Sequence, residues 1–179
     1  MLARGASALV VDVRVNGGGS DVFGLELASR LAREPYVAFA KVARNDPDDP
    51  ARFTPPQRSV VRPSERPGFR GPVALLTSGY TVSAGETFTQ ALLGRTPPVL
   101  RAGEPTQGVF SDVLLRRLPN GWQFGLPNEL FLTAEGTTFD GAGIPPDVAV
   151  PALPDRDLAA GRDPALERAL ALLRPAARP

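Results

Sequence analysis

Apolar and polar positions follow two different periods along the first part of the chain. The run "ALVVDVRV" at 8–15 is largely apolar and β-branched, as in a buried strand, and it ends in the glycine-rich turn "NGGGSD". "DVFGLELASRLAR" follows with apolar residues at a helical spacing, and Ser20 or Asp21 is a suitable N-cap. The pattern predicts a strand, a glycine turn and a helix in that order.

The same order recurs later in the chain. "GPVALLTS", which starts at Gly71, is another buried-strand pattern, and "SAGETFTQALLG" at 83–94 has helical spacing. Glu86 stands three residues after Ser83, as in a capping box, and Gly94 is a typical helix stop. We expect a second strand–turn–helix unit whose helix opens at Ser83.

The remaining segments predict further strands, a loop and a final helix. "YVAFAKVA" at 36–43 predicts a strand, and the Pro- and Arg-rich stretch 46–71 predicts a long surface loop. "VFSDVLLRRL", a "PNG" turn and "WQFGL" have the pattern of a β-hairpin, "NELFLT" that of a strand, and "DPALERALALLR" that of an amphipathic helix. We expect an α/β fold with a largely parallel central sheet and an antiparallel hairpin appendage. We place one core domain at 1–154 and a C-terminal helix and tail at 155–179.

The composition excludes several kinds of chemistry. The 179 residues contain no cysteine and no histidine, which excludes thiolate catalysis and the common zinc sites, so we expect neither a metal nor a cofactor. The 20 basic and 19 acidic residues are mixed along the chain, so we expect no nucleic-acid partner. Lys41 is the only lysine and thus the one candidate for a lysine base. The start of the chain lacks the pattern of a secretory signal, and as written we expect the chain to stay in the cytoplasm.

The glycine-rich turn does not match a nucleotide site. The sixth position of G-x-G-x-x-G counted from Gly17 is Val22, and no G-K-[ST] follows the turn. Backbone N–H groups near a helix start could instead bind a developing oxyanion. The alternative is an ordinary tight turn that needs positive φ angles.

Ser83 also allows two interpretations. "TVSAG" resembles a nucleophile elbow with Thr81 in place of the first glycine, but hydrolases with that elbow use a histidine that this chain lacks. The alternative is a helix N-cap in which the Ser83 hydroxyl and the Glu86 carboxylate each accept a backbone N–H. Two strand–turn–helix units place their turns at the same carboxyl edge of a parallel sheet, so Ser83 and the glycines could face one another. A hydroxyl opposite free N–H groups is the geometry that acyl transfer needs.

Four motifs together carry a family resemblance. "VVDVRVNGGG", "GPVALLTSGYTVSAGETFTQAL", "AGEPTQG" and "GAGIPPDV" span roughly Gly5 to Val150. In their order and spacing the chain resembles the carboxy-terminal processing (tail-specific) serine protease family, closest to its tricorn-core and interphotoreceptor retinoid-binding-protein-like branch. The resemblance implies a ClpP/crotonase-like core, cleavage of a peptide or protein substrate through an acyl-enzyme, and an extracytoplasmic setting for the full-length family.

The resemblance also implies roles for individual residues. The family's nucleophile falls on Ser83, and its oxyanion hole falls on the backbone N–H groups of Gly18 and Ala84. Asp140, in "TTFDGAGIPPD", falls where the tricorn branch carries the carboxylate of its catalytic tetrad. Without the resemblance, Asp140 is equally an aspartate before glycine in an ordinary turn.

The general base of the family has no counterpart in this sequence. The lysine-dependent branch carries its base at the position of Val109, and the tricorn branch carries a histidine before the "VDVR" strand. We expect Lys41, at mid-strand, to face solvent or to snorkel towards it, while Glu86 is tied to the helix turn and Tyr80 would need a strongly lowered pKa. The chain alone is therefore expected to be weak or inactive.

Three hypotheses account for the missing base. The chain is the C-terminal part of a serine protease catalytic domain, and the coding sequence upstream of Met1 supplies a histidine-containing segment. Alternatively, it is a non-catalytic module that holds the carboxyl end of a peptide or an apolar ligand in the same cleft. In the third hypothesis a partner chain donates the base, and activity requires an oligomer.

Overall fold

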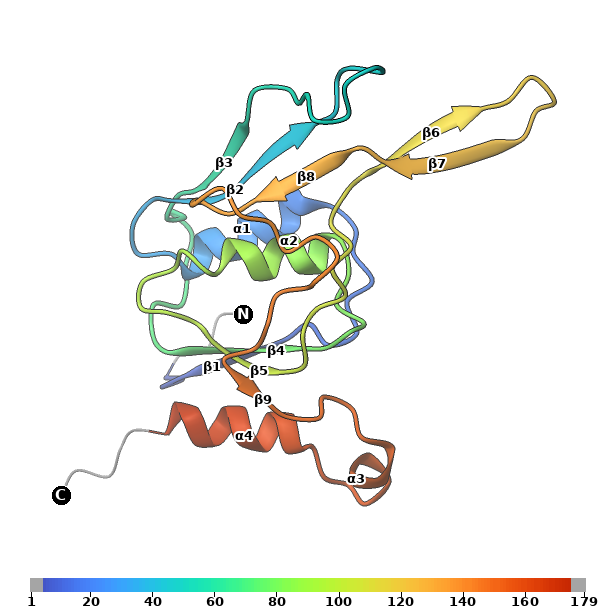
Figure 1. The fold of residues 1–179 in the computed structure, drawn as a ribbon. Helices are drawn as coiled ribbons and strands as arrows, with labels where there is room; N and C mark the ends of the chain where they lie inside the picture. The colour runs from blue at the N-terminus through green and yellow to red at the C-terminus, as the bar shows by residue number, and fades with distance from the viewer. Residues whose placement is uncertain (1–4, 175–179) are drawn as a thin grey trace.

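Helices and sheets stack in layers (Figure 1). The computed structural model describes residues 5–174. The elements in chain order are β1 (Leu9–Asp12), α1 (Asp21–Leu31), β2 (Tyr36–Ala43), β3 (Gln57–Val61), β4 (Val73–Thr77), α2 (Ala84–Ala91), β5 (Leu100–Gly103), β6 (Val113–Arg117), β7 (Gln123–Pro127), β8 (Glu129–Leu132), β9 (Val148–Ala149), α3 (Asp155–Ala159) and α4 (Pro164–Leu173).

The central sheet is parallel, as predicted. Its four strands lie in the order β1-β4-β5-β9, and Leu9 of β1 lies opposite Val73 of β4. Every residue of β4 is buried, which explains its continuously apolar sequence. Because β1 and β4 run in the same direction, the loops that follow them leave the sheet at the same edge.

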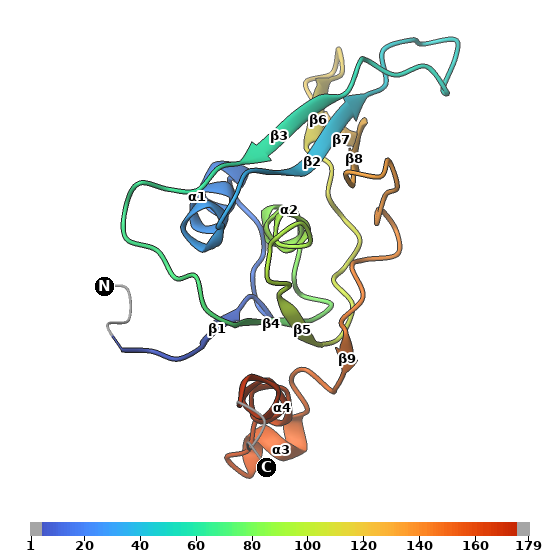
Figure 2. The same ribbon diagram turned by 90° about the vertical axis from the view of Figure 1, so that its left-hand side faces the viewer.

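Helices α1 and α2 lie between two sheets. The parallel sheet covers one side of them, the antiparallel sheet β3-β2-β8 covers the other, and α4 packs on the outer face of the parallel sheet (Figure 2). All residues of α2 are buried. The helix that opens after Ser83 is therefore fixed on both sides by packing.

The stretch 46–71 is not a continuous surface loop, so that prediction was wrong in part. Gln57–Val61 forms β3, which pairs antiparallel with β2 and places Val61 opposite Tyr36. The prolines of this stretch lie before and after these residues, so they bound an edge strand without removing its hydrogen bonds. The strand at 36–43 was predicted correctly, but it belongs to the antiparallel sheet.

The predicted hairpin is confirmed as β6 and β7, which form a two-stranded sheet of their own. The hairpin extends away from the layered body (Figure 1). Three short elements, β5, β9 and α3, were not predicted. Within residues 5–174, no helix is both long and apolar enough to cross a membrane.

Candidate active site

Ser83 occupies a sharp turn between β4 and α2. Its backbone angles, φ 54° and ψ −119°, are rare for a residue with a side chain. Its N–H donates to the Val109 carbonyl at 2.9 Å, and its carbonyl accepts from the N–H groups of Glu86 and Thr87 at 2.7 and 3.0 Å. These bonds hold the unusual conformation from both sides of the residue.

The glycine-rich loop after β1 packs directly against this turn. Val82 N–H donates to the Asn16 carbonyl at 2.9 Å. A β-carbon added to Gly18 would lie 2.8 Å from Ser83 Cβ and 3.2 Å from Ser83 Oγ, and Gly18 has a φ of +98°. Only glycine fits there for both reasons. The structure therefore brings together the two turns that the sequence placed at one sheet edge.

The two candidate oxyanion donors differ in their present hydrogen bonding. Ala84 is the first residue of α2, and its N–H has no acceptor within residues 5–174. Such first-turn donors lie at the positive end of a helix and favour an anion. The Gly18 N–H instead donates to Asn16 Oδ1 at 3.0 Å. Gly18 must share or leave that bond before it can bind an oxyanion.

Glu86 does more than the capping box predicted from the sequence. Ser83 and Glu86 form the predicted capping box, in which the Glu86 carboxylate accepts the Ser83 N–H at 3.3 Å. The same buried carboxylate accepts the N–H groups of Gly108 and Val109, both at 2.7 Å. Glu86 therefore ties the loop at 108–109 to the backbone of Ser83.

Asp140 lies on a segment held against that same loop. The Gly141 N–H donates to the Gly108 carbonyl at 2.7 Å, and the Asp140 N–H donates to Thr138 Oγ1 at 3.1 Å. The Asp140 side chain is exposed. In the described part of the chain, no hydrogen bond joins its carboxylate to Ser83. Asp140 is near the site through its backbone neighbours but has no direct contact with the nucleophile candidate.

A cavity of about 550 Å³ opens beside the two turns. Its walls include Phe23 and Leu27 of α1 and Phe88 of α2, and its rim includes Gly18 and Ala84. Gly18 and Ala84 therefore line the same cavity as these apolar side chains. The cavity thus matches a binding site for an apolar side chain of a peptide.

Comparisons with known proteins agree with this geometry. The profile of peptidase family S41 matches residues 1–150. The chain belongs to this family. It is 35% identical over 170 residues to "Tricorn protease homolog 1" of Streptomyces coelicolor, which covers 92% of the chain and 14% of that protein. It is 29% identical over 147 residues to "Carboxyl-terminal-processing peptidase 1, chloroplastic" of Arabidopsis thaliana, covering 82% of the chain and 28% of that protein.

Solved structures show the same fold. A Parabacteroides merdae protein described as a peptidase superposes with a TM-score of 0.85 at 30% identity, over 96% of this chain and 53% of that one. The tricorn protease superposes with a TM-score of 0.65 at 24% identity, over 93% and 15% of the two chains. This S41 chain thus spans only a small part of the curated relatives that it matches.

The only lysine of this S41 chain is engaged in ion pairs. Lys41 Nζ pairs with Asp112 at 3.2 Å and Glu129 at 3.1 Å, and it lies 5.6 Å from the centre of the Phe131 ring. Burial lowers the pKa of Lys41, but the hydrogen bonds to Glu129 and Asp112 outweigh burial and raise it. Lys41 therefore stays a paired cation, and its side chain is partly buried, as in the snorkelling alternative. Tyr80, another weak candidate for a base, is 69% exposed.

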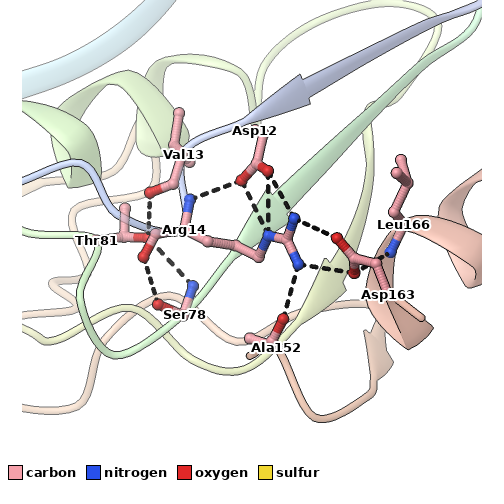
Figure 3. A network of polar contacts seen from close by, with 8 residues as sticks. All are labelled: Asp12, Val13, Arg14, Ser78, Thr81, Ala152, Asp163 and Leu166. Atoms are coloured by element: carbon pink, nitrogen blue, oxygen red, sulfur yellow. Dashed lines mark hydrogen bonds and ion pairs between the residues drawn. The ribbon is translucent and has the colours of Figure 1, made fainter. Parts of the chain in front are cut away.

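Sequence reasoning missed a buried arginine that fixes the loop after β1 (Figure 3). The Arg14 guanidinium bonds both Asp12 and Asp163, with closest contacts of 2.7 Å to each, and donates to the Ala152 carbonyl. Hydrogen bonds to Asp12 and then to Asp163 raise the pKa of Arg14, and the bond from Arg14 lowers the pKa of Asp163. Arg14 thus joins the start of α4 to the end of β1.

Two buried hydroxyls join the loops after β1 and β4 (Figure 3). Ser78 Oγ donates to the Arg14 carbonyl at 2.6 Å, and Thr81 Oγ1 donates to the Val13 carbonyl at 2.8 Å. Both residues follow β4 and precede Ser83. A polar residue immediately after a buried strand was the available sequence signal, but the partners are more than 60 positions away in the chain.

Proposed function

We propose that this S41 chain is the C-terminal part of a serine peptidase catalytic domain, with Ser83 as the nucleophile. Ser83 Oγ would attack the carbonyl carbon of a peptide, and its proton would pass to a base that lies outside this chain. The C–N bond would then break, the amine would leave with a proton, and water would release the acyl group. The observation that carries this proposal is the close approach of Gly18 to Ser83, beside the Ala84 N–H, which has no acceptor in the described part of the chain.

The developing negative charge would be stabilised by two backbone N–H groups. Ala84 supplies one at the positive end of α2, and Gly18 supplies the other by sharing its bond to Asn16. Asp140 would orient the base once that base is present, as the family resemblance implies. Without the base we expect only the residual reactivity that a bound and polarised carbonyl retains.

Labelling with a fluorophosphonate tests this proposal. We expect slow covalent labelling of the chain that disappears in Ser83→Ala. Gly18→Ala should reduce the labelling rate at least tenfold, because the new methyl group would collide with Ser83. Gly17→Ala is the matched control, since no atom lies within 4 Å of the added β-carbon. Equal labelling of wild type and Ser83→Ala would refute the role of Ser83.

A non-catalytic binding module is the second candidate. Lys41 is held in ion pairs, the chain has no histidine, and the apolar cavity at Phe23 and Phe88 is large enough for a ligand. This hypothesis predicts no labelling of Ser83 together with saturable binding of peptides that carry an apolar side chain. Isothermal titration with such a peptide, in wild type and Ser83→Ala, separates the two functions.

The source of the base can be tested independently. If a partner chain donates it, the labelling rate per chain should fall when the protein is diluted to the monomer. A rate that is independent of concentration contradicts donation by a partner. For the full-length protein we propose an extracytoplasmic setting and peptide or protein substrates, which cell fractionation and product analysis would test.

A further inference from the structure

The hairpin β6–β7 leaves an unusual amount of apolar surface in solvent. Every residue of both strands is exposed, and Leu115 and Leu126 retain 65% and 59% of their accessible surface. Residues opposite each other in the register share a face, so Leu114 and Leu126 lie on one face and Val113 and Leu115 on the other. Trp122 at the turn is 72% exposed. Contiguous patches of this kind mark interaction sites.

The outer edge of β6 is open along its whole length. Leu118 N–H donates to the Trp122 carbonyl, so these two residues form a hydrogen-bonded pair. Along an antiparallel ladder, hydrogen-bonded pairs alternate with non-hydrogen-bonded pairs. Val113, Leu115 and Arg117 fall in the non-hydrogen-bonded pairs, so their backbone N–H and C=O groups point away from β7. Within residues 5–174, no strand other than β7 pairs with β6. Among the described residues, the one hydrogen bond to this edge is a long contact of 3.4 Å from Arg116 Nη1 to the Leu115 carbonyl.

The outer edge of β7 differs from that of β6. By the same alternation, Gln123, Gly125 and Pro127 face outward, and Pro127 has no N–H to donate. Proline on an edge is a common device against the addition of another strand. Since only the β7 edge is blocked in this way, the β6 edge is the one open to a new strand.

The β6 edge is also continuous with the candidate active site. The Val109 carbonyl accepts the Ser83 N–H, and β6 begins four residues later at Val113. Four residues of extended chain span at most about 14 Å. The Val113 end of β6 is therefore within about 14 Å of Val109, the residue that accepts the Ser83 N–H.

The charge of the hairpin favours one class of occupant. Residues 113–127 include Arg116 and Arg117 and contain no aspartate or glutamate. An anionic peptide complements this charge, whereas a second copy of the hairpin would bring two more arginines. A lipid surface would leave the N–H and C=O groups of the edge without partners.

We propose that the open edge of β6 binds an extended apolar segment of a polypeptide substrate as an added strand, with acidic residues of that segment beside Arg116 and Arg117. The inference rests on the proposed peptidase function, because it assigns the bound segment to the substrate. Backbone hydrogen bonds to Val113, Leu115 and Arg117 supply the affinity, and the apolar side chains on both faces supply the preference for alternating apolar residues.

Fluorescence anisotropy with a labelled peptide tests the proposal. The probe is a seven-residue peptide of alternating threonine and valine that ends in two aspartates. We expect saturable binding that Leu115→Pro weakens at least tenfold, because proline removes one outward N–H and leaves the ladder to β7 intact. Gln123→Pro, which removes an outward N–H on the β7 edge, is the matched control and should change the Kd less than twofold. Failure of the probe to bind, or equal effects of the two prolines, overturns the proposal.

A second measurement keeps the protein unchanged. In an added strand, every second backbone N–H of the probe faces β6 and the others face solvent. Methylation of the nitrogens that face β6 should abolish binding, whereas methylation of the nitrogens that face solvent should leave binding unchanged. Equal binding of the two methylated probes contradicts an added strand. Dimerisation detected by light scattering and removed by Leu115→Pro would assign the edge to a second copy, and sedimentation with phosphatidylglycerol vesicles would assign it to lipid; either result overturns the proposal.

The failure of this inference is distinguishable from failure of the proposed function. Fluorophosphonate is small and does not need β6, so Leu115→Pro should keep the wild-type labelling rate. If the wild-type chain is not labelled but binds the peptide, the proposed peptidase function is refuted and the strand-binding site on β6 stands. Retained labelling without peptide binding does the reverse.

Discussion

The backbone around Ser83 and the hairpin β6–β7 are close in the chain but are built in opposite ways. Val109 accepts the Ser83 N–H, and only three residues separate Val109 from the start of β6. Around Ser83 the buried Glu86 carboxylate accepts three N–H groups, and every residue of α2 is buried. On the hairpin many apolar side chains are exposed, and within residues 5–174 no second strand pairs with the outer edge of β6.

The difference shows where this chain is preorganised and where it is open to a partner. Buried polar groups must be paired, so the loops around Ser83 have one arrangement. In the described part of the chain, neither the apolar faces of the hairpin nor the outer edge of β6 is covered, so both are accessible to a binding partner. Substitutions in the first region should therefore change stability, whereas those in the second should change binding alone.

Glu86→Gln should have the largest effect on stability. The amide NH₂ group would face backbone N–H groups that now donate to the carboxylate, and each lost charge-assisted bond costs about 1.5–3 kcal/mol. We expect the free energy of unfolding in urea to fall by about 3 kcal/mol or more. Glu26→Gln, on the exposed face of α1, is the control and should show no measurable change. Similar values for the two variants would mean that Glu86 does not fix the loop.

Asp163→Asn should have the next largest effect. Arg14 would lose one of its two carboxylate partners while it stays buried, and we expect a loss of about 2 kcal/mol at pH 7. The hydrogen bond from Arg14 lowers the pKa of Asp163 in the folded state. The ion pair therefore contributes fully to stability above the unfolded pKa of about 3.9, and this contribution is lost as the pH falls through the lower folded pKa. Urea unfolding from pH 7 to pH 2 should show the gap between wild type and variant closing only below about pH 4. A gap that stays constant over that range would contradict the ion pair.

The difference in stability between Ser83→Gly and Ser83→Ala should be smaller, and it should favour glycine. Glycine adopts the positive φ of this position without strain, so Ser83→Gly should be more stable than Ser83→Ala by about 1 kcal/mol. Both variants lack the hydroxyl, so the comparison isolates the backbone. Thermal unfolding of the two proteins measures it, and a Ser83→Ala variant of equal or greater stability would show that the turn is not strained.

Trp122→Ser should have the smallest effect. Its side chain is exposed at the tip of the hairpin, and substitutions at such sites usually change stability by less than about 0.5 kcal/mol. Urea unfolding should match wild type. A loss of more than about 1 kcal/mol would mean that the hairpin packs against the body, and the contrast between the two regions would fail.

Local sequence patterns predicted the fold well where an element carries its own signal. The half-buried edge strand β1, the buried strand β4, the amphipathic α1 and α4, and the hairpin turn were all evident from periodicity and turn residues. β3 was missed because its prolines and arginines are typical of loops and only its pairing with β2 makes it a strand. The two-residue β9 is too short to carry any pattern of its own.

The position of the candidate site was predictable from the sequence, but the hydrogen bonds that hold its loops in place were not. The repeated strand–turn–helix order placed Ser83 and Gly18 at one edge, and the structure brings them into contact. The partners of Glu86 lie 22 and 23 positions later in the chain, and Arg14 reaches Asp163 across 149 positions. Such contacts depend on tertiary packing, and no local pattern encodes them.

The most direct test of the central claim is to map the fluorophosphonate adduct by mass spectrometry of proteolytic fragments. If Ser83 is a nucleophile held by its turn beside an oxyanion site, the adduct will lie on Ser83 alone, although Ser20 and Tyr80 are more exposed. An adduct on Ser20 or Tyr80, or one spread over several hydroxyls, would contradict the account.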